Sequence, residues 1–196
     1  MKEPFFEENV FLIDEKVQFL KFENVYNIYN DQQELIGTIN QKISTPLKIL
    51  SLFINKMMFP FHLDIKNTNN DIIAGVSRPW SFFLSQITIK NGEGIAIGVI
   101  KQKFKLFKSK FEIYDMRNQL IGIIMGDWRA WNFVISDTLG QEIGTITKKW
   151  NGVMKEIFTT ADKYIVNLAP DYANAGNRIV ILACAITIDM IFKESK

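Results

Sequence analysis

Residues 177–192 read NRIVILACAITIDMIF, the most apolar run in the chain. Apolar side chains lie on every side of a helix drawn through this run, so such a helix must be buried in a core or in a bilayer. The fourteen residues from Ile179 to Phe192 make about 21 Å of helix, whereas a bilayer core needs about 20 residues. We therefore expect a buried core helix over 177–193. A buried strand, favoured by the β-branched residues Ile179, Val180 and Ile181, and a membrane span remain the alternatives.

The composition indicates one cytoplasmic domain built around that run. The chain has 196 residues, 47% of them hydrophobic, which suffices for one core. Residues 1–9 carry charged side chains and no apolar segment, so no signal peptide is expected. The single cysteine, Cys184, lies in the apolar run and is expected to be buried. A net charge of +2 does not indicate a nucleic-acid-binding protein.

A hairpin pattern occurs five times upstream of the apolar run. Each copy has an alternating apolar strand, a turn rich in Asn, Asp and Gly, then an apolar residue, a glycine and a second strand. This is the pattern of a β-hairpin. The copies are residues 25–39, 61–76, 87–100, 111–124 and 133–146, marked by Gly37, Gly75, Gly98, Gly122 and Gly144. These glycines are 38, 23, 24 and 22 residues apart, so only the first interval carries an insertion.

The strands are predicted to close into a barrel. Five hairpins supply ten strands, and residues 10–13 and 17–22 read as two more, on either side of the polar residues 14–16. Closure removes the exposed edges that an open sheet of this length would leave. A barrel of about 12 strands has an interior that its own side chains do not fill. We therefore predict a mainly β (α+β) domain over 1–196, a closed antiparallel barrel wrapped around the C-terminal helix. The glycines are expected at bulges or where another backbone, such as the central helix, comes close.

Several stretches of the chain resemble the phospholipid scramblase family. They are GTITKKWNGVMKEIFTTADKYIVN at 144–167 with IDMIFKES at 188–195, PFHLDIKN and the following SRP within 60–79, and YNIYN at 26–30. The likeness is specific at the C-terminal end and looser over residues 1–60. It implies a tubby-like or LURP-one-like fold, a closed antiparallel barrel around a hydrophobic C-terminal helix, the same shape that the repeats predict.

Signatures of catalysis are weak, and we expect that the protein is not an enzyme. One histidine, His62, and one cysteine exclude a Cys/His zinc site. A Cys–His nucleophile pair is not expected either, because Cys184 lies in the apolar run. The glycines of NGEGIAIG at 91–98 lack the Gly-Lys-Ser/Thr of a P-loop and indicate a hairpin turn instead.

The family resemblance implies a calcium-binding segment at 159–171. Calcium takes several closely spaced oxygen ligands. Asp162 and Asp171 are retained as calcium candidates, but Thr160 stands where the family usually has its first Asp. Two carboxylates are too few for a firm site, so no cofactor is expected. The family's nuclear-import stretch overlaps 145–152 with only two lysines, and the palmitoylated cysteines of animal members are missing.

The insertion in the first interval predicts an amphipathic helix over 44–58, STPLKILSLFINKMM. Thr45 is a candidate N-cap and Pro46 suits the first helical position. An apolar stripe follows at helical spacing, formed by Leu50, Phe53, Ile54, Met57 and Met58. The helix is expected to lie on the barrel, or alternatively in the membrane interface.

A lysine run at 101–110, KQKFKLFKSK, is the strongest local charge in the chain. Its lysines, Lys101, Lys103, Lys105, Lys108 and Lys110, are candidates for binding anionic phospholipid. The first three alternate with other residues and so share one strand face. Edge protection or simple solubility is the alternative role for lysine on a strand.

Aromatic residues are predicted to gather at one end of the barrel. In an up-and-down meander the turns within copies lie at one end, and the connections between copies lie at the other. All four tryptophans, Trp80, Trp128, Trp131 and Trp150, fall in or beside the connections, whereas the turns read as polar. Trp beside Lys or Arg is common at membrane interfaces. Trp80, Phe82 and Phe83 are the candidates for membrane insertion, unless the aromatic residues fold inward over the helix.

Two functions follow from these observations. The first is a scramblase-related protein that binds anionic membrane lipids peripherally, with or without moving them between leaflets, placed in the cytoplasm or at the inner face of the membrane. The second is a soluble tubby-like module that binds a protein or a small apolar ligand. Nucleic-acid binding is not expected, and no particular protein partner is predicted.

Overall fold

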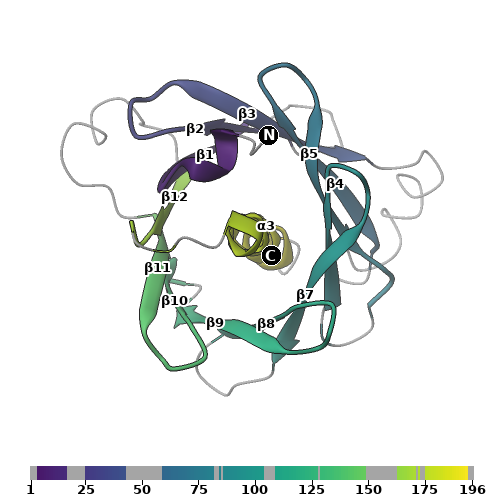
Figure 1. Cartoon of the computed structure of the whole chain (residues 1–196), viewed down its shortest axis with the longest axis vertical. Coiled ribbons are helices and arrows are strands. Elements are labelled where there is room, and N and C mark those ends of the chain that lie inside the picture. The colour runs from purple at the N-terminus through teal and green to yellow at the C-terminus, as the bar shows by residue number, and fades with distance from the viewer. Residues whose placement is uncertain are drawn as a thin grey trace.

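The strands form a closed ring around one helix (Figure 1). The computed structural model describes residues 4–16, 25–42, 59–81, 84, 86–103, 109–127, 129–148, 163–170, 172 and 175–193. Within these residues every strand pairs antiparallel with the next one in sequence, and β1 pairs with β12 to close the ring. In chain order the elements are η1 (Pro4–Glu7), β1 (Val10–Lys16), β2 (Val25–Tyr29), β3 (Leu35–Lys42), β4 (Phe61–Asn67), β5 (Ile72–Arg78), β6 (Gln86–Asn91), β7 (Ala96–Lys103), β8 (Ser109–Tyr114), β9 (Leu120–Asp127), β10 (Asn132–Ser136), β11 (Glu142–Thr147), β12 (Lys163–Leu168) and α3 (Ala175–Lys193). The predicted closed antiparallel barrel of twelve strands is confirmed.

The origin of the first and last strands differs from the prediction. The five hairpins β2–β3, β4–β5, β6–β7, β8–β9 and β10–β11 coincide with the five sequence copies. The polar residues 14–16 belong to β1 and do not form a turn, because Asp14 lies on the outer face and pairs with Lys163 at 3.4 Å. Residues 17–22 lie outside the described part of the chain. The twelfth strand is β12, for which the sequence predicted no strand.

All five hairpins use the same turn. Its first residue accepts hydrogen bonds from the amide four residues later through its side chain, at Asn30, Asn67, Asn91, Asp115 and Asp137. The fourth residue has a positive φ, at Gln33, Asn70, Gly94, Asn118 and Gly140. Asn, Asp and Gly suit these positions because they tolerate the left-handed region and bond to the nearby backbone. We call the barrel end formed by these turns the turn end, and the opposite end the connection end.

Each hairpin also carries a bulge at its second strand. The extra residue is an isoleucine in all five copies, Ile36, Ile73, Ile97, Ile121 and Ile143. A glycine follows it in four copies, and there an added Cβ would meet a carbonyl oxygen of the next strand, at 2.5 Å for Gly37 and 2.4 Å for Gly144. The predicted bulge is confirmed. Among the five glycines that mark the repeat, Gly98 is the one whose nearest neighbours include the central helix, with Val180 3.1 Å from the position of an added Cβ.

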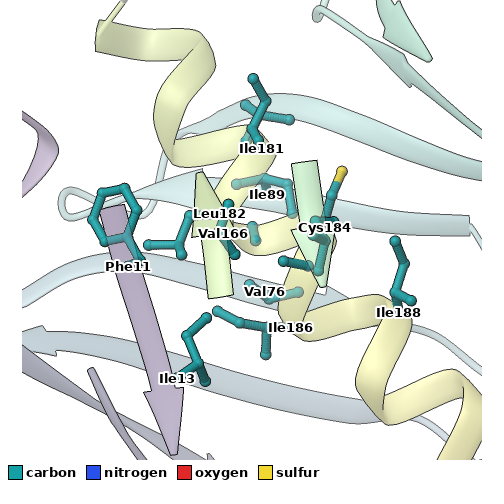
Figure 2. Packing of buried hydrophobic residues seen from close by; sticks show 14 of the residues in the cluster. Phe11, Ile13, Val76, Ile89, Val166, Ile181, Leu182, Cys184, Ile186 and Ile188 are labelled. Carbon is teal, nitrogen blue, oxygen red and sulfur yellow. The ribbon is translucent and has the colours of Figure 1, made fainter. Parts of the chain in front are cut away.

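The central helix α3 is buried on all sides. Its side chains from Val180 to Ile191 are at most 3% exposed, and they pack against inward side chains of the strands. Figure 2 shows Phe11, Ile13 and Val166 pointing toward this helix. Burial of Cys184 raises the pKa of its thiol well above the ordinary value. The expectation of a buried core helix is confirmed, and the strand alternative is wrong.

The N-terminal segment covers the turn end of the barrel. Phe5 in η1 is buried and packs on Phe11 with ring centroids 5.6 Å apart. The Arg178 guanidinium in the first turns of α3 donates to the carbonyls of Glu7 and Glu8 at 3.1 and 3.0 Å, and to Asn9 Oδ1 at 2.9 Å. This arginine therefore joins the two ends of the described chain.

Candidate functional site

The predicted lysine site lies on the outer face of β7 and β8. Lys103 is directly opposite Lys110 across these strands, and Lys101 is opposite Glu112. Their neighbours Ile100 and Phe111 point into the core. The structure thus brings Lys101, Lys103 and Lys110 together on one wall. Lys105 and Lys108 lie outside the described residues, and their part in the site stays a prediction.

Glu112 sits in the middle of these lysines. Its Oε1 accepts from Lys110 Nζ at 2.7 Å, and its Oε2 lies 3.3 Å from Lys103 Nζ and accepts from the Tyr114 hydroxyl at 2.7 Å. Hydrogen bonds from Lys110, Tyr114 and Lys103 lower the pKa of Glu112 from 4.5 to about 2, against the opposing effect of burial. One carboxylate therefore offsets part of the positive charge of this wall. The sequence did not predict the role of Glu112, because this residue follows the lysine run and contacts it only across the hairpin.

Lys101 is held on the same wall by an aromatic ring. Its Nζ lies 4.2 Å from the centroid of the Tyr114 ring and donates to Asn118 Oδ1 at 2.9 Å. The ring orients the ammonium group by a cation–π contact. The wall is thus an ordered arrangement of three lysines, one tyrosine and one glutamate.

The two described tryptophans behave differently. Trp80, after β5, is 43% exposed and packs on Phe59 with ring centroids 5.1 Å apart. Trp131 folds inward and stacks on the buried Tyr164, with ring centroids 5.5 Å apart. For Trp131 the alternative expectation of closing the barrel mouth is the one that the structure supports. Trp128, Trp150, Phe82 and Phe83 lie outside the described residues.

Buried polar groups lie inside the connection end. The Tyr26 hydroxyl donates to Asp189 Oδ2 in α3 at 3.0 Å. Burial, followed by the charge of Asp189, raises the pKa of both Tyr26 and Tyr164 well above the ordinary value. Lys148 caps the outside of this group, with Nζ 4.3 Å from the Trp131 ring centroid. The end of the helix is therefore fixed by polar contacts as well as by apolar packing.

Charge is distributed unevenly between the two ends. The five turns and the two residues after each hold seven carboxylates against one basic residue, Arg117. The carboxylates are those of Asp31, Glu34, Asp71, Glu93, Asp115, Asp137 and Glu142. The ammonium groups of Lys66 and Lys101 also reach two of these turns, where they donate to Asn70 and Asn118. Lys103 and Lys110, by contrast, lie toward the connection end, where β7 ends and β8 begins. The acids of the turns thus lie at the end opposite to the one predicted to meet lipid.

The turn end carries exposed hydrophobic side chains as well as polar ones. Of the described large hydrophobic side chains that are exposed, five belong to the turn end: Leu35 at 46%, Ile72 at 43%, Ile95 at 58%, Met116 at 54% and Leu139 at 90%. Met116 and Leu139 lie within turns that are otherwise polar, whereas Leu35, Ile72 and Ile95 lie just after a turn. The turns are polar as predicted, but the turn end as a whole also exposes aliphatic side chains.

His62 belongs to a hydrogen-bonded group on the outer face of β4 and β5. Its Nδ1 lies 2.8 Å from Ser77 Oγ and its Nε2 lies 2.9 Å from Asp64 Oδ1, and Lys42 pairs with the same carboxylate. Burial would raise the pKa of Asp64, but Lys42 and His62 lower it overall.

A serine, a histidine and an aspartate in series suggest acyl transfer, which also requires donors for an oxyanion. The backbone of these strands is engaged in the ladders of β3 through β6. We interpret the group as structural, because its side chains bond to one another across the paired strands β4 and β5.

Metal binding rests on residues beyond the described ones. Asp162 and Asp171 both lie outside the described part of the chain, so the calcium candidates stay a prediction. Within the described ranges, no group of three His, Cys, Asp or Glu side chains is placed to hold a metal ion. Nor does any helix in those ranges have the length and hydropathy needed to cross a bilayer. The amphipathic segment 44–58 also lies outside them.

Comparison with protein families gives one match, over nearly the whole chain. The sequence model described as Scramblase matches residues 9–195. Similar proteins include a phospholipid scramblase family protein of Schizosaccharomyces pombe, 23% identical over 97% of this chain and 55% of its own length. The altered inheritance rate of mitochondria protein 25 of Saccharomyces cerevisiae is 22% identical over 87% of this chain and 65% of its own length. The human phospholipid scramblase family member 5 is 26% identical over 66% of this chain and 52% of its own length. The chain thus spans about half to two-thirds of the length of these relatives.

The fold has a counterpart among solved structures. An X-ray structure of a protein from Arabidopsis thaliana superposes with a TM-score of 0.56, covering 96% of this chain and 97% of the other, at 7% sequence identity. A likeness at this identity concerns the fold alone. It confirms the predicted tubby-like architecture of a closed barrel around a helix.

Proposed function

The chain belongs to the Scramblase family, and from this premise we propose that it binds anionic phospholipid membranes peripherally through its connection end and the adjacent lysine wall. The observation that carries the proposal is the ordered set of lysines on one outer face. Lys103 and Lys110 lie toward the connection end and Lys101 lies nearer the turns, whose acids are at the opposite end. The names of the relatives support a phospholipid as the ligand.

The energetics favour a reversible contact. A lysine near an anionic membrane contributes about 1 kcal/mol, and this falls with added salt. Glu112 takes up part of that charge, since it binds both Lys103 and Lys110. Trp80 adds an exposed aromatic ring after β5, which is separated from the lysine wall by β6. An indole ring at headgroup depth suits an interface because it is both apolar and polar.

The interior of the barrel does not favour the rival role of binding a small apolar ligand. α3 fills the space between the strands, and its buried side chains contact inward residues around the ring (Figure 2). Such a ligand would have to replace packed core side chains. The outer surface is therefore the better candidate for recognition.

The experiment is flotation with liposomes of phosphatidylcholine alone and of phosphatidylcholine with phosphatidylserine. Binding should require the anionic lipid and weaken with salt. Replacing Lys103 and Lys110 with Gln should lower vesicle affinity by up to about thirtyfold, at about 1 kcal/mol for each lysine near the surface. The matched control is Lys66→Gln with Lys90→Gln, which changes net charge equally on strands that run into the acidic turns. Equal losses for the two pairs would reject a specific lysine wall.

Two further arms test the docking end and lipid transport. Tryptophan fluorescence should shift to the blue on adding anionic vesicles, and the shift should shrink in Trp80→Phe if that ring enters the interface. Movement of lipid between leaflets, the finer activity, is followed with fluorescent lipid and an external quencher in the same vesicles. Repeating both arms with calcium and with a chelator tests the candidates Asp162 and Asp171.

A further inference from the structure

The turn between β6 and β7 begins with Asn91 followed directly by Gly92. An asparagine can cyclise when the next backbone nitrogen attacks its side-chain amide carbon, and glycine has no side chain to hinder that approach. Asn91 is partly exposed and Gly92 is exposed, so water reaches both residues. The other Asn-Gly pair of the chain, at 151–152, lies outside the described residues. The β6–β7 turn is therefore the described place where this reaction meets the least steric hindrance.

The turn holds the side-chain oxygen of Asn91 between two backbone amides. Glu93 N and Ile95 N donate to Asn91 Oδ1 at 3.1 and 2.9 Å. Gly94 N also donates to the backbone carbonyl of Asn91 at 2.9 Å. The Gly92 amide is not one of these donors. Two amides directed at one oxygen stabilise negative charge that develops on it.

Cyclisation places negative charge on that same oxygen. When hydroxide removes the Gly92 amide proton, the nitrogen bonds to Asn91 Cγ and the electron pair of the C=O bond moves to Oδ1. The oxyanion then lies beside the two donating amides, as in an oxyanion hole. Collapse restores the C=O bond and releases the side-chain nitrogen, protonated by water, as ammonia, which leaves a five-membered succinimide. The reaction is intramolecular, so alignment needs only rotation about bonds of Asn91.

The repeat already contains the product of this reaction. Water that attacks the former side-chain carbon of the ring breaks its bond to nitrogen and gives aspartate. Asp115 and Asp137 occupy the same position in two other turns, where Oδ1 accepts from the amides two and four residues later at 2.8–2.9 Å. A carboxylate at position 91 would therefore keep the hydrogen bonds of the turn.

The packing around the turn favours aspartate over isoaspartate. Asn91 pairs with Ala74 of β5. A Cβ added at Gly92 would lie 2.6 Å from the carbonyl oxygen of Ile72, so the main chain passes close to β5 here. Isoaspartate forms when water attacks the backbone carbonyl of the ring, and it lengthens the main chain by a methylene that would disturb both contacts. The folded protein should thus give a larger share of aspartate than a flexible peptide does.

We propose that Asn91 is a site of spontaneous deamidation, and that the folded turn assists the attack of the Gly92 nitrogen through the amides of Glu93 and Ile95. Water is the other reactant and ammonia the leaving group. The reaction adds a carboxylate to the acidic turn end and lowers the net charge of the chain from +2 by one unit. It does not depend on lipid binding, so its failure would leave the proposed function untouched.

The test follows each asparagine by mass spectrometry after incubation of the purified protein at neutral pH. Asn30 and Asn67 are internal controls. They begin equivalent turns with an amide donating to Oδ1, at 2.8 and 2.9 Å, but residues with side chains follow them. Asn91 should react faster than either. Fragmentation that distinguishes aspartate from isoaspartate gives the product ratio at the same time.

A synthetic peptide of residues 86–97 separates the effect of the fold from that of the sequence. The folded protein should react about tenfold faster than this peptide, less than a full oxyanion donor provides, because the two amides already bond to the ground-state oxygen. It should also give the larger share of aspartate. The variant Asn91→Asp should keep the native midpoint of thermal unfolding, as the turns of Asp115 and Asp137 imply, whereas Asn91→Ala should lower it.

Two results would overturn the proposal. One is a rate at Asn91 no greater than at Asn30 and Asn67. The other is a rate in the folded protein no greater than in the peptide, which would mean that the turn holds the side chain away from the Gly92 nitrogen. A lowered unfolding midpoint in Asn91→Asp would reject the conclusion that the turn accepts the product.

Discussion

Glu112 combines two opposing effects in one side chain. It stabilises the fold by accepting from Lys110, Tyr114 and Lys103, and it lowers the charge that these lysines offer to a lipid surface. Replacing it with Gln should therefore separate stability from binding. The free energy of unfolding should fall, whereas the affinity for anionic vesicles should rise.

The pH dependence follows from the lowered pKa of Glu112. The folded-state pKa of about 2 lies below the ordinary 4.5, so this carboxylate contributes stability above pH 4.5 that is lost as the pH falls toward 2. After allowance for solvent screening we expect Glu112→Gln to cost about 1–2 kcal/mol at pH 7. The variant should also lose less stability than the native protein between pH 5 and about 2. Urea unfolding at several pH values measures this, and equal pH profiles would contradict it.

The same variant should bind anionic vesicles more tightly. Removing the carboxylate releases Lys103 and Lys110 to interact with phosphate, so flotation should require less phosphatidylserine. Glu93→Gln, at the turn end, provides a matched change of one charge. A gain of equal size in both variants would indicate a response to net charge and not to the lysine wall.

At the scale of elements, α3 depends on complete burial. Ala185 is fully buried among the strands, so Ala185→Asp would place a carboxylate in an apolar core. The expected cost is several kcal/mol, or neutralisation of the carboxyl group. Thermal unfolding followed by circular dichroism should show a much lower midpoint or no cooperative transition. Ala130→Asp, in the exposed turn after β9, is the control and should unfold normally. A native-like transition for Ala185→Asp would show that the helix is not enclosed.

Patterns within an element predicted most of the fold. The hairpin copies located ten strands, and the apolar run located α3, because inward alternation and all-round hydrophobicity are properties of short segments. β12 was missed because Tyr164, Ile165 and Val166 are apolar without alternation. Here Tyr164 and Val166 join the core cluster, whereas Ile165 is buried outside it. Residues 14–16 were expected to separate two strands because they are polar. They belong to β1, where Asp14 lies on the outer face.

Contacts between distant segments could not be predicted. Asp189 meets Tyr26 across 163 positions, and Glu112 meets Lys103 across a hairpin. Nothing in the local pattern of either segment specifies the other. The lysine positions were predicted from their density, but their partners depend on strand register, which only the closed barrel fixes.

At the scale of the whole molecule, Arg178 connects the start of the described chain to its last element. Its guanidinium donates to Tyr172 O at 2.9 Å in addition to the carbonyls of Glu7 and Glu8. Arg178→Ala would remove several charge-assisted hydrogen bonds and should cost about 2–4 kcal/mol. Hydrogen exchange should increase in residues 4–9 and in the first turn of α3. Faster exchange spread evenly over all strands would contradict a local role for this arginine.

The position of α3 after all twelve strands in sequence has a consequence for how the protein is made. Proteins are synthesised from the N-terminus, and strands that have emerged before the segments they pack against expose apolar surface. The strands emerge from the ribosome before the helix that fills them, and β1 waits for β12 across most of the chain. The apolar inward faces of the hairpins are therefore exposed to solvent and prone to aggregate until the helix has been synthesised. We expect the nascent chain to be a client of chaperones until α3 leaves the ribosome.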